Sequence, residues 1–237
     1  MWFKGSLVTE KALERVATRR GKNYLQKSIS KSELDSYLAE GWQVKYESKY
    51  RSTVHKSKEP DELFEDTVWK LFKDMSFQEM NDDRNFEIKI GQDYQQVDVF
   101  ARDGNNIFIV ECKSSKNNKV ITKSEISAIS DLKKDICTSI KQHYQEKSLR
   151  ISFLLATQGR QWIAEREEMA KKRQILVCQD NDISYLSELI EHLGSSARYQ
   201  FYSLMFRDKK AASHNWWKFD LAISYTLLSS KSIPLSN

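Results

Sequence analysis

The alternation of apolar and polar residues is clearest between residues 96 and 115, where it predicts two β-strands joined by a tight turn. Residues 97–100 and 107–110 are rich in the β-branched and aromatic side chains that favour strands. The segment between them, 103–106, contains the Gly-Asn pair typical of a two-residue hairpin loop. The other predicted elements are arranged around this hairpin.

Further elements follow from the hydrophobic periods on both sides of the hairpin. Helices are predicted at residues 60–75, 122–146, 161–172 and 183–193, and strands at 86–90, 151–156 and 175–178. The polar stretch 114–119 is expected to be a loop. Because strands alternate with helices in the second half of the chain, we expect parallel neighbours in one sheet. The predicted fold class is α/β, with a central mixed sheet flanked by helices.

Two carboxylates are predicted to meet across the hairpin. If Gly104 and Asn105 form its loop, Asp98 lies opposite Glu111, about 5 Å away, where like charges repel. A cation must offset this repulsion, or one carboxyl group must be protonated. Lys113 lies on the same face as Glu111, and two acidic oxygen donors beside an ammonium suit Mg²⁺, which keeps several waters when protein carboxylates bind it. The alternative interpretation is that all three are ordinary strand charges.

The order Asp98, hairpin, Glu111-Cys112-Lys113 resembles the motif of the PD-(D/E)xK nuclease superfamily. The flanking pattern is most similar to the restriction-endonuclease-like, Mrr-type branch, although Val97 stands where a proline often precedes the aspartate. The resemblance implies hydrolysis of phosphodiester bonds that depends on Mg²⁺ or Mn²⁺ and leaves 5′-phosphates. By the same resemblance, Asp98 and Glu111 are the metal ligands, and Lys113 orients or helps to deprotonate the attacking water.

The helix that begins at Pro60 carries a further acidic candidate. Its apolar stripe predicts a side that faces the core, with Glu65 on the border and with Glu62 and Asp66 pointing away. Because the superfamily often places a third acid on this helix, the resemblance makes Glu65 a catalytic candidate that supports the metal or orients water. The alternative is an ordinary acid near the positive end of the helix.

Positive charge is concentrated at the N-terminal end. Residues 1–58 contain 13 Lys and Arg against 6 Asp and Glu, whereas the rest of the chain contains 25 against 27. Residues 42–55 alternate as a half-buried strand or hairpin arm, with Lys45, Lys49 and Arg51 on the polar face. Such a face binds a phosphate backbone through its charge, which makes these residues candidates for nucleic-acid binding. A solvated face explains the pattern equally well.

These patterns divide the chain into three parts. They are a basic N-terminal extension (1–58), a PD-(D/E)xK nuclease-like domain (59–194) and an aromatic-rich C-terminal segment (195–237). The element order of the middle part is similar to the restriction-endonuclease-like core: helix, three strands, helix, strand, helix, strand, helix. The aromatic residues of the last part form no chemical constellation, so they predict a packing or partner surface.

The composition of the chain limits the size of its core, the compartment and the kinds of site that can be expected. With 237 residues, 40% of them hydrophobic, the chain can bury one nuclease-sized core. Three cysteines without CxxC spacing predict reduced thiols in a cytoplasmic protein, and four scattered histidines argue against a zinc site. No apolar run has the length of a membrane span, and the N-terminus lacks a signal-peptide core, so no membrane partner is expected.

The function predicted from the sequence is a Mg²⁺-dependent DNA endonuclease of a restriction or defence system. The alternative is a catalytically inactive nucleic-acid-binding module that keeps the nuclease-like fold. A third hypothesis is a subunit whose acidic site is completed only on assembly. The expected partner is nucleic acid, with DNA favoured, and cleavage of two strands would favour a homodimer or a larger complex.

Overall fold

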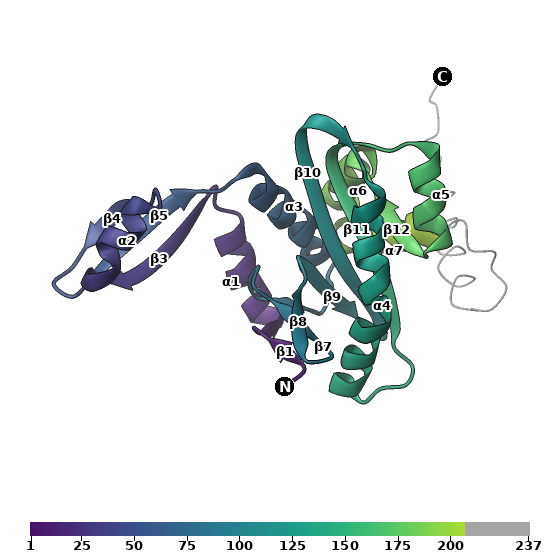
Figure 1. Cartoon of the computed structure of the whole chain (residues 1–237), viewed down its shortest axis with the longest axis horizontal. Helices are drawn as coiled ribbons and strands as arrows, with labels where there is room; N and C mark the ends of the chain where they lie inside the picture. The colour runs from purple at the N-terminus through teal and green to yellow at the C-terminus, as the bar shows by residue number, and fades with distance from the viewer. Residues whose placement is uncertain (207–237) are drawn as a thin grey trace, which may run out of the picture.

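The computed structural model describes residues 1–206, and Figure 1 shows how the elements are arranged. The first half contains β1 (Phe3–Lys4), β2 (Leu7–Thr9), α1 (Glu10–Arg20), β3 (Tyr24–Ser30), the 3₁₀ turn η1 (Lys31–Glu33), α2 (Leu34–Ala39), β4 (Gln43–Glu47), β5 (Arg51–Ser57), α3 (Pro60–Asp74), β6 (Glu79–Asn81), β7 (Glu87–Ile90) and β8 (Asp93–Gln96). The second half contains β9 (Val99–Asp103), β10 (Asn106–Val120), α4 (Lys123–Tyr144), β11 (Arg150–Gln161), α5 (Ala164–Lys172), β12 (Ile175–Cys178), α6 (Asp180–Leu193), η2 (Gly194–Ser196) and α7 (Ala197–Phe206).

A six-stranded mixed sheet lies at the centre of the fold, in the order β12-β11-β10-β9-β6-β2. β10, β11 and β12 run parallel, as predicted, while β10, β9, β6 and β2 pair antiparallel. Residues of β10 alternate between two hydrophobic clusters: Phe108 and Val110 pack with α3 and α7, and Ile107 and Ile109 pack with α4. Helices therefore cover both faces. The predicted fold class, an α/β core with a central mixed sheet flanked by helices, is confirmed.

Aromatic rings fill the layer between the sheet and α3. The ring centroid of Phe108 on β10 lies 5.8 Å from that of Phe72 on α3 and 5.1 Å from that of Phe201 on α7. Phe201 is 1% exposed, and the neighbouring Tyr202 is also buried. The packing role predicted for aromatic residues of the C-terminal segment is therefore confirmed for this pair. The tryptophans of that segment lie outside the described residues.

Two details of the predicted strand order are wrong. Residues 86–90 do contain a strand, β7, but it lies in a separate three-stranded sheet with β1 and β8. The place beside β9 in the central sheet is taken by β6. This strand has only three residues, so it is too short to show a hydrophobic period in the sequence.

The predicted loop at residues 114–119 is also wrong, because β10 continues to Val120. The extension stays paired with β11 around an irregularity in the register, and it is polar and mostly exposed. It therefore lacks the alternation that reveals a strand in the sequence. Gly159 allows the two strands to approach at the irregularity, since its φ is +58° and a Cβ there would clash with the carbonyl oxygen of Ser115.

Residues 1–20, which the sequence placed in an N-terminal extension, pack onto the core. β2 adds to the edge of the central sheet by pairing with β6, and β1 pairs with β7. Leu13 and Val16 of α1 are buried in the same cluster as the apolar side of α3.

Residues 24–57 form an arm that projects from the core (Figure 1). In the arm, β3, β5 and β4 make an antiparallel sheet in that order. One face of this sheet is closed by a small cluster of Ile29, Trp42 and Val54, against which Leu34 and Tyr37 of the α2 segment pack. The predicted hairpin at residues 42–55 is confirmed as β4 and β5.

None of the helices within residues 1–206 is long and apolar enough to cross a bilayer. The three cysteines are free, with Cys112 and Cys178 buried. Buried free thiols act as small apolar side chains, in agreement with the role predicted for them.

Replacing Phe201 by alanine is expected to lower the free energy of unfolding by about 3 to 5 kcal/mol, because a buried ring is lost and a cavity is left. Tyr199→Ala is the matched control: it lies on the same helix, is 41% exposed, and is expected to change the stability by about 0.5 kcal/mol. Urea unfolding of the two variants measures the difference. Equal midpoints would show that α7 adds nothing to the core.

Candidate functional site

The β9–β10 hairpin has the register predicted from its turn. The ladder runs from the turn to Val99 opposite Val110. Asp98 lies one residue before β9, so it is next in line with Glu111 but just outside the ladder. Its Oδ2 accepts a hydrogen bond of 2.7 Å from the backbone N–H of Cys112. The carboxylate of Asp98 therefore takes the place of a strand partner at this point of β10.

Asn81 of β6 fixes the backbone around Asp98. This fully buried side chain donates through Nδ2 to the carbonyl oxygen of Asp98 at 3.1 Å, and its Oδ1 accepts a hydrogen bond of 3.0 Å from the N–H of Phe100. The carbonyl group of Asn81 in turn accepts a hydrogen bond from Trp69 of α3. Asp98 is thus held in place by bonds to its backbone as well as by its own side chain.

The carboxyl group of Asp98 is buried and close to a second negative charge. Burial and then the charge of Glu111 raise its pKa to about 6, against the hydrogen bond from Cys112 and the charge of Lys113. Asp98 is therefore harder to ionise than an ordinary aspartate, and a nearby cation would favour its ionised form.

Lys113 lies on the same face of β10 as Glu111, as the alternation of side chains predicts. Its Nζ is 2.6 Å from Glu111 Oε1. Burial opposes the charged form of Lys113, but the charge and hydrogen bond of Glu111, together with the charge of Asp98, outweigh it and raise the pKa of the lysine. The ammonium therefore stays protonated at neutral pH.

Glu65 of α3 is near Asp98. Burial and then the charge of Asp98 raise the pKa of Glu65 to about 7, against the opposing charge of Arg84. Arg84 Nε lies 3.1 Å from Glu65 Oε2, but the two atoms are not oriented for a hydrogen bond. Glu65 Oε2 is therefore a buried oxygen without a hydrogen-bond partner among the described residues. An oxygen in that position suits a bound water or a cation.

The prediction that Asp66 points away from the core is wrong. Asp66 is buried, and its carboxylate pairs with Arg20, Lys58 and Arg84. The helical period indicated a solvated side because it could not show that α1 and the end of the arm cover this face of α3. A burial that depends on a distant segment leaves no trace in a local pattern.

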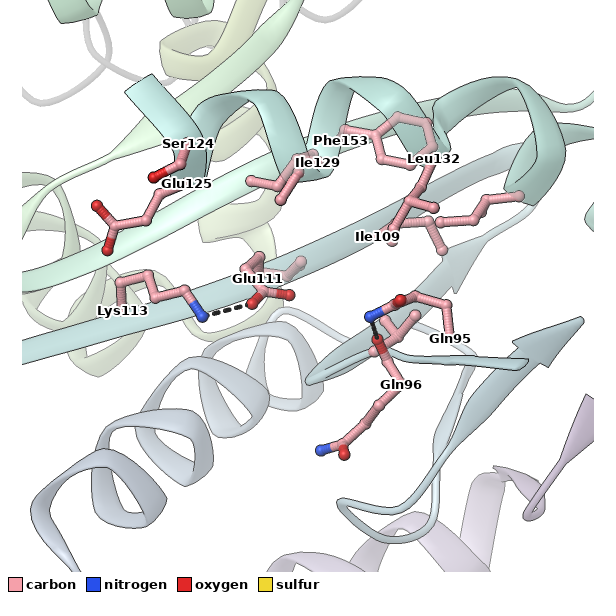
Figure 2. Close-up of a pocket in the computed structure, with 14 residues that line it drawn as sticks. Gln95, Gln96, Ile109, Glu111, Lys113, Ser124, Glu125, Ile129, Leu132 and Phe153 are labelled. Atoms are coloured by element: carbon pink, nitrogen blue, oxygen red, sulfur yellow. Dashed lines mark hydrogen bonds and ion pairs between the residues drawn. The ribbon is translucent and has the colours of Figure 1, made fainter. Parts of the chain in front are cut away.

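A cavity of about 370 Å³ borders Glu111 and Lys113, between β10 and α4. Figure 2 shows these two side chains on β10, Glu125 at the start of α4, and Gln95 and Gln96 on the other side. Apolar side chains form much of the remaining wall, among them Ile109, Ile129, Leu132 and Phe153. Two of the candidate catalytic residues, Glu111 and Lys113, therefore lie at the edge of a space that can admit part of a substrate.

Sequence reasoning missed several residues of this region. Asn81 and Arg84 belong to short or irregular segments that show no period. Glu125 forms the capping box of α4 together with Thr122. In addition, the Glu125 carboxylate lies 2.8 Å from Arg160 Nη2, and its charge acts on Lys113.

Within residues 1–206, no three His, Cys, Asp or Glu side chains gather as a metal-holding group. The candidate donor set is therefore the pair predicted from the sequence, Asp98 and Glu111. The pair fits a hard divalent ion, because it offers only oxygen donors and because burial and then the charge of Glu111 raise the pKa of Asp98. Mg²⁺ needs no more than one or two protein carboxylates, since it keeps several waters.

The three candidates for nucleic-acid binding lie on the arm. Lys45 and Arg51 lie on the face of the arm sheet that α2 does not cover. Lys45 Nζ is 3.2 Å from the hydroxyl oxygen of Tyr24, and Arg51 Nη2 donates to the carbonyl oxygen of Ser28 at 2.7 Å. Lys49 lies in the turn between β4 and β5, and all three are exposed. Because the arm projects from the core (Figure 1), these residues form a surface separate from the candidate carboxylates.

No protein family and no curated protein match the sequence. Among solved structures, the chain is similar to protein VC1899 from Vibrio cholerae (14% identity over 78% of this chain and 51% of that one, TM-score 0.40). It is also similar to Can2 from Sulfobacillus thermosulfidooxidans in complex with cyclic tetra-adenylate (16% identity, 55% and 36%, TM-score 0.39), and to a repair endonuclease from Pyrococcus abyssi (14% identity, 59% and 65%, TM-score 0.31). The chain thus spans about half the length of the Vibrio cholerae protein. All three TM-scores are low, so the functional conclusion depends on the site itself.

Proposed function

We propose that the protein is a metal-dependent nuclease that hydrolyses phosphodiester bonds, with Asp98, Glu111 and Lys113 as catalytic residues. The observation that carries the proposal is the buried carboxylate of Asp98 beside Glu111, with the Lys113 ammonium 2.6 Å from Glu111. Two repelling carboxylates can hold a divalent cation, and the ammonium can contact a phosphate. The resemblance of this motif to that of PD-(D/E)xK nucleases supports the same conclusion.

The residues divide the chemical work among them. Asp98 and Glu111 would hold Mg²⁺ or Mn²⁺, which when bound supplies Lewis-acid charge to a phosphate oxygen. The Lys113 ammonium, whose pKa is raised, would act as a donor that orients the attacking water and offsets the charge developing on the phosphate. Glu65, with a pKa of about 7, is suited to accept a proton near neutral pH and takes the supporting role.

The proposed substrate is nucleic acid, and the favoured setting is DNA cleavage in a restriction or defence system. The exposed cations of the arm support this substrate, because a phosphate backbone is bound largely through charge. Cleavage of both strands of a duplex would require two such sites, and a homodimer or a larger complex would supply them.

Lys113→Ala is expected to reduce metal-dependent cleavage at least about 100-fold, because the donor that offsets transition-state charge is lost. Lys116→Ala is the matched control, since it removes an exposed lysine from the same strand and should leave cleavage unchanged. Cleavage is measured on labelled single- and double-stranded DNA and RNA with Mg²⁺, with Mn²⁺ and with chelator.

The same assay distinguishes the nuclease from its alternatives. Cleavage that persists in Asp98→Asn would contradict the proposed site. A wild-type protein that binds these substrates but cleaves none of them would be an inactive binding module. Cleavage that appears only above a threshold protein concentration would indicate a site completed by assembly.

Metal affinity is expected to increase as the pH rises from about 5.5 to about 7.5, because protons on the carboxyl groups compete with the cation below their raised pKa values. These values are about 6 for Asp98 and about 7 for Glu65. The stability of the metal-free protein changes with pH in the opposite direction. Because folding raises the pKa of these carboxyl groups, their ionisation destabilises the folded protein relative to the unfolded chain. The melting temperature therefore falls as the pH rises over this range. Glu65→Gln should make the pH dependence of the metal affinity and that of the melting temperature less steep. Calorimetric Mn²⁺ titrations and melting curves at several pH values test this, and an affinity unchanged in Asp98→Asn would exclude the donor set.

A nucleic-acid-binding role of the arm is a second proposal, favoured by the exposure of Lys45, Lys49 and Arg51 on a projecting element. Replacing all three with glutamine is expected to weaken oligonucleotide binding in chelator and to reduce the slope of log affinity against log salt by about 2 to 3. The control replaces three exposed lysines elsewhere, Lys134, Lys141 and Lys147, with glutamine. Fluorescence anisotropy measures both. Equal slopes would show that the arm residues are only solvated.

A further inference from the structure

A second cavity, of about 480 Å³, lies where the arm joins the core. It is bounded by β3 of the arm, by the end of α1 and by residues 83–85, which precede β7. Two of its twelve lining residues are acidic, and half are cationic: Arg19, Arg20, Lys22, Lys27, Lys58 and Arg84. The proposed chemistry at Asp98 and Glu111 does not account for this positive lining.

Three of these cations converge on one buried carboxylate. Asp66 Oδ1 accepts a hydrogen bond of 3.0 Å from Arg20 Nη1, and its Oδ2 accepts one of 2.7 Å from Lys58 Nζ and another from Arg84. The side chains of Arg20 and Lys58 are only 4% and 1% exposed. Even with Glu65, which lies 3.1 Å from Arg84, two carboxylates face three cations, and unbalanced charge away from water is unfavourable.

Arg20 shows this shortage of negative charge directly. Its Nε and Nη2 are buried and have no hydrogen-bond partner among the described residues. Burial lowers its pKa, the charge and hydrogen bond of Asp66 oppose this, and the charges of Arg84 and Arg19 lower the pKa further. A further anion nearby would stabilise the charged guanidinium.

The cavity connects the basic face of the arm with the candidate active site. Tyr24, in the cavity wall, is the residue whose hydroxyl oxygen lies 3.2 Å from Lys45 Nζ on the arm. Arg84, in the opposite part of the wall, is the residue whose Nε lies 3.1 Å from Glu65 Oε2. The cationic side chains of the cavity therefore lie between the basic face of the arm and Glu65.

We propose that this cavity binds a phosphate group of the nucleic-acid strand, in addition to the phosphodiester that is cleaved. Guanidinium groups match phosphate oxygens through paired N–H donors, and the lysines at the rim, Lys22 and Lys27, add charge. A strand with a phosphate at every nucleotide fits a path that runs from the arm to the site, whereas a small free anion would use the cavity alone. The inference rests on the proposed function for the identity of the strand, but binding itself needs neither metal nor cleavage.

The rim of the cavity is the place to test the proposal, because Arg20 and Lys58 also join α1 and the arm to α3 and their replacement would unfold this region. Lys22→Gln/Lys27→Gln removes two cations that are at least partly exposed, and Lys134→Gln/Lys141→Gln on the exposed side of α4 makes the same change of charge elsewhere. Binding of labelled single- and double-stranded oligonucleotides to the full chain is measured by anisotropy in chelator over a range of salt concentrations.

The rim variant is expected to bind about tenfold more weakly near 0.1 M salt, with a salt slope smaller by about 1.5 to 2, because two phosphate contacts are lost. The control on α4 should change the affinity less than about twofold. Oligonucleotides with and without a 5′-phosphate identify the source of the group. A preference for the phosphorylated end assigns the cavity to a strand end, equal binding assigns it to an internal phosphodiester, and either result supports the proposal.

An unchanged affinity and salt slope in the rim variant would overturn the proposal. A melting temperature that rises with inorganic phosphate, in a protein that binds no oligonucleotide, would overturn it as well and assign the cavity to a free anion. The two proposals can fail separately. If the protein never cleaves but the rim variant loses binding, the cavity proposal is supported and the nuclease proposal is refuted. If the protein cleaves in a metal-dependent way but the rim variant binds unaltered, the nuclease proposal is supported and the cavity proposal is refuted.

Discussion

The pairing of two carboxylates at the end of the β9–β10 ladder is the interaction on which the rest of the site depends. The hairpin register places Asp98 next in line with Glu111, and the hydrogen bond from Cys112 holds it there. Burial and then the negative charge of Glu111 raise the pKa of Asp98. The charge of Lys113 offsets part of this rise. The ammonium contacts Glu111, however, so burial and repulsion still keep the pKa of Asp98 raised. A site with this imbalance is suited to a cation from outside the chain.

Two neighbouring residues of α3 show how unevenly the charges are distributed. Glu65 and Asp66 are adjacent in sequence, yet the pKa of Glu65 is raised to about 7 while Asp66 pairs with three cations. Arg84 contacts both carboxylates. A fold optimised only for stability would place those cations beside the carboxylates that repel one another, because buried charges are most stable when each is balanced. The proposed binding of an anion and of a cation side by side would balance the excess of cations on one side of Glu65 and of carboxylates on the other.

The sequence alone was sufficient where a local pattern carries the information. The hairpin register follows from Gly104 and Asn105, and the parallel order of β10, β11 and β12 follows from alternating strands and helices. It was insufficient where distant segments meet. The helical period predicts a solvated Asp66, but the residue is buried. β6 is too short to show a hydrophobic period. The polar end of β10 forms a strand because it pairs with β11. Asn81 fixes the backbone of Asp98 from a strand that no pattern revealed, so the support of the site was less predictable than its acidic residues.

The two charge excesses also complement each other in the capture of a polyanion. Carboxylates at Asp98 and Glu111 repel a phosphate backbone until a cation neutralises them, so they cannot attract the strand on their own. The exposed lysines and arginine of the arm act over a longer range and are weakened by salt, while Arg20 and Lys58 in the cavity are shielded from water and therefore less screened. A strand attracted by the arm and held at the cavity would be drawn towards the carboxylates through Arg84. Apart from Lys113, which contacts Glu111, these positive groups lie beside the acidic site and not within it, which would leave Asp98 available for the proposed metal.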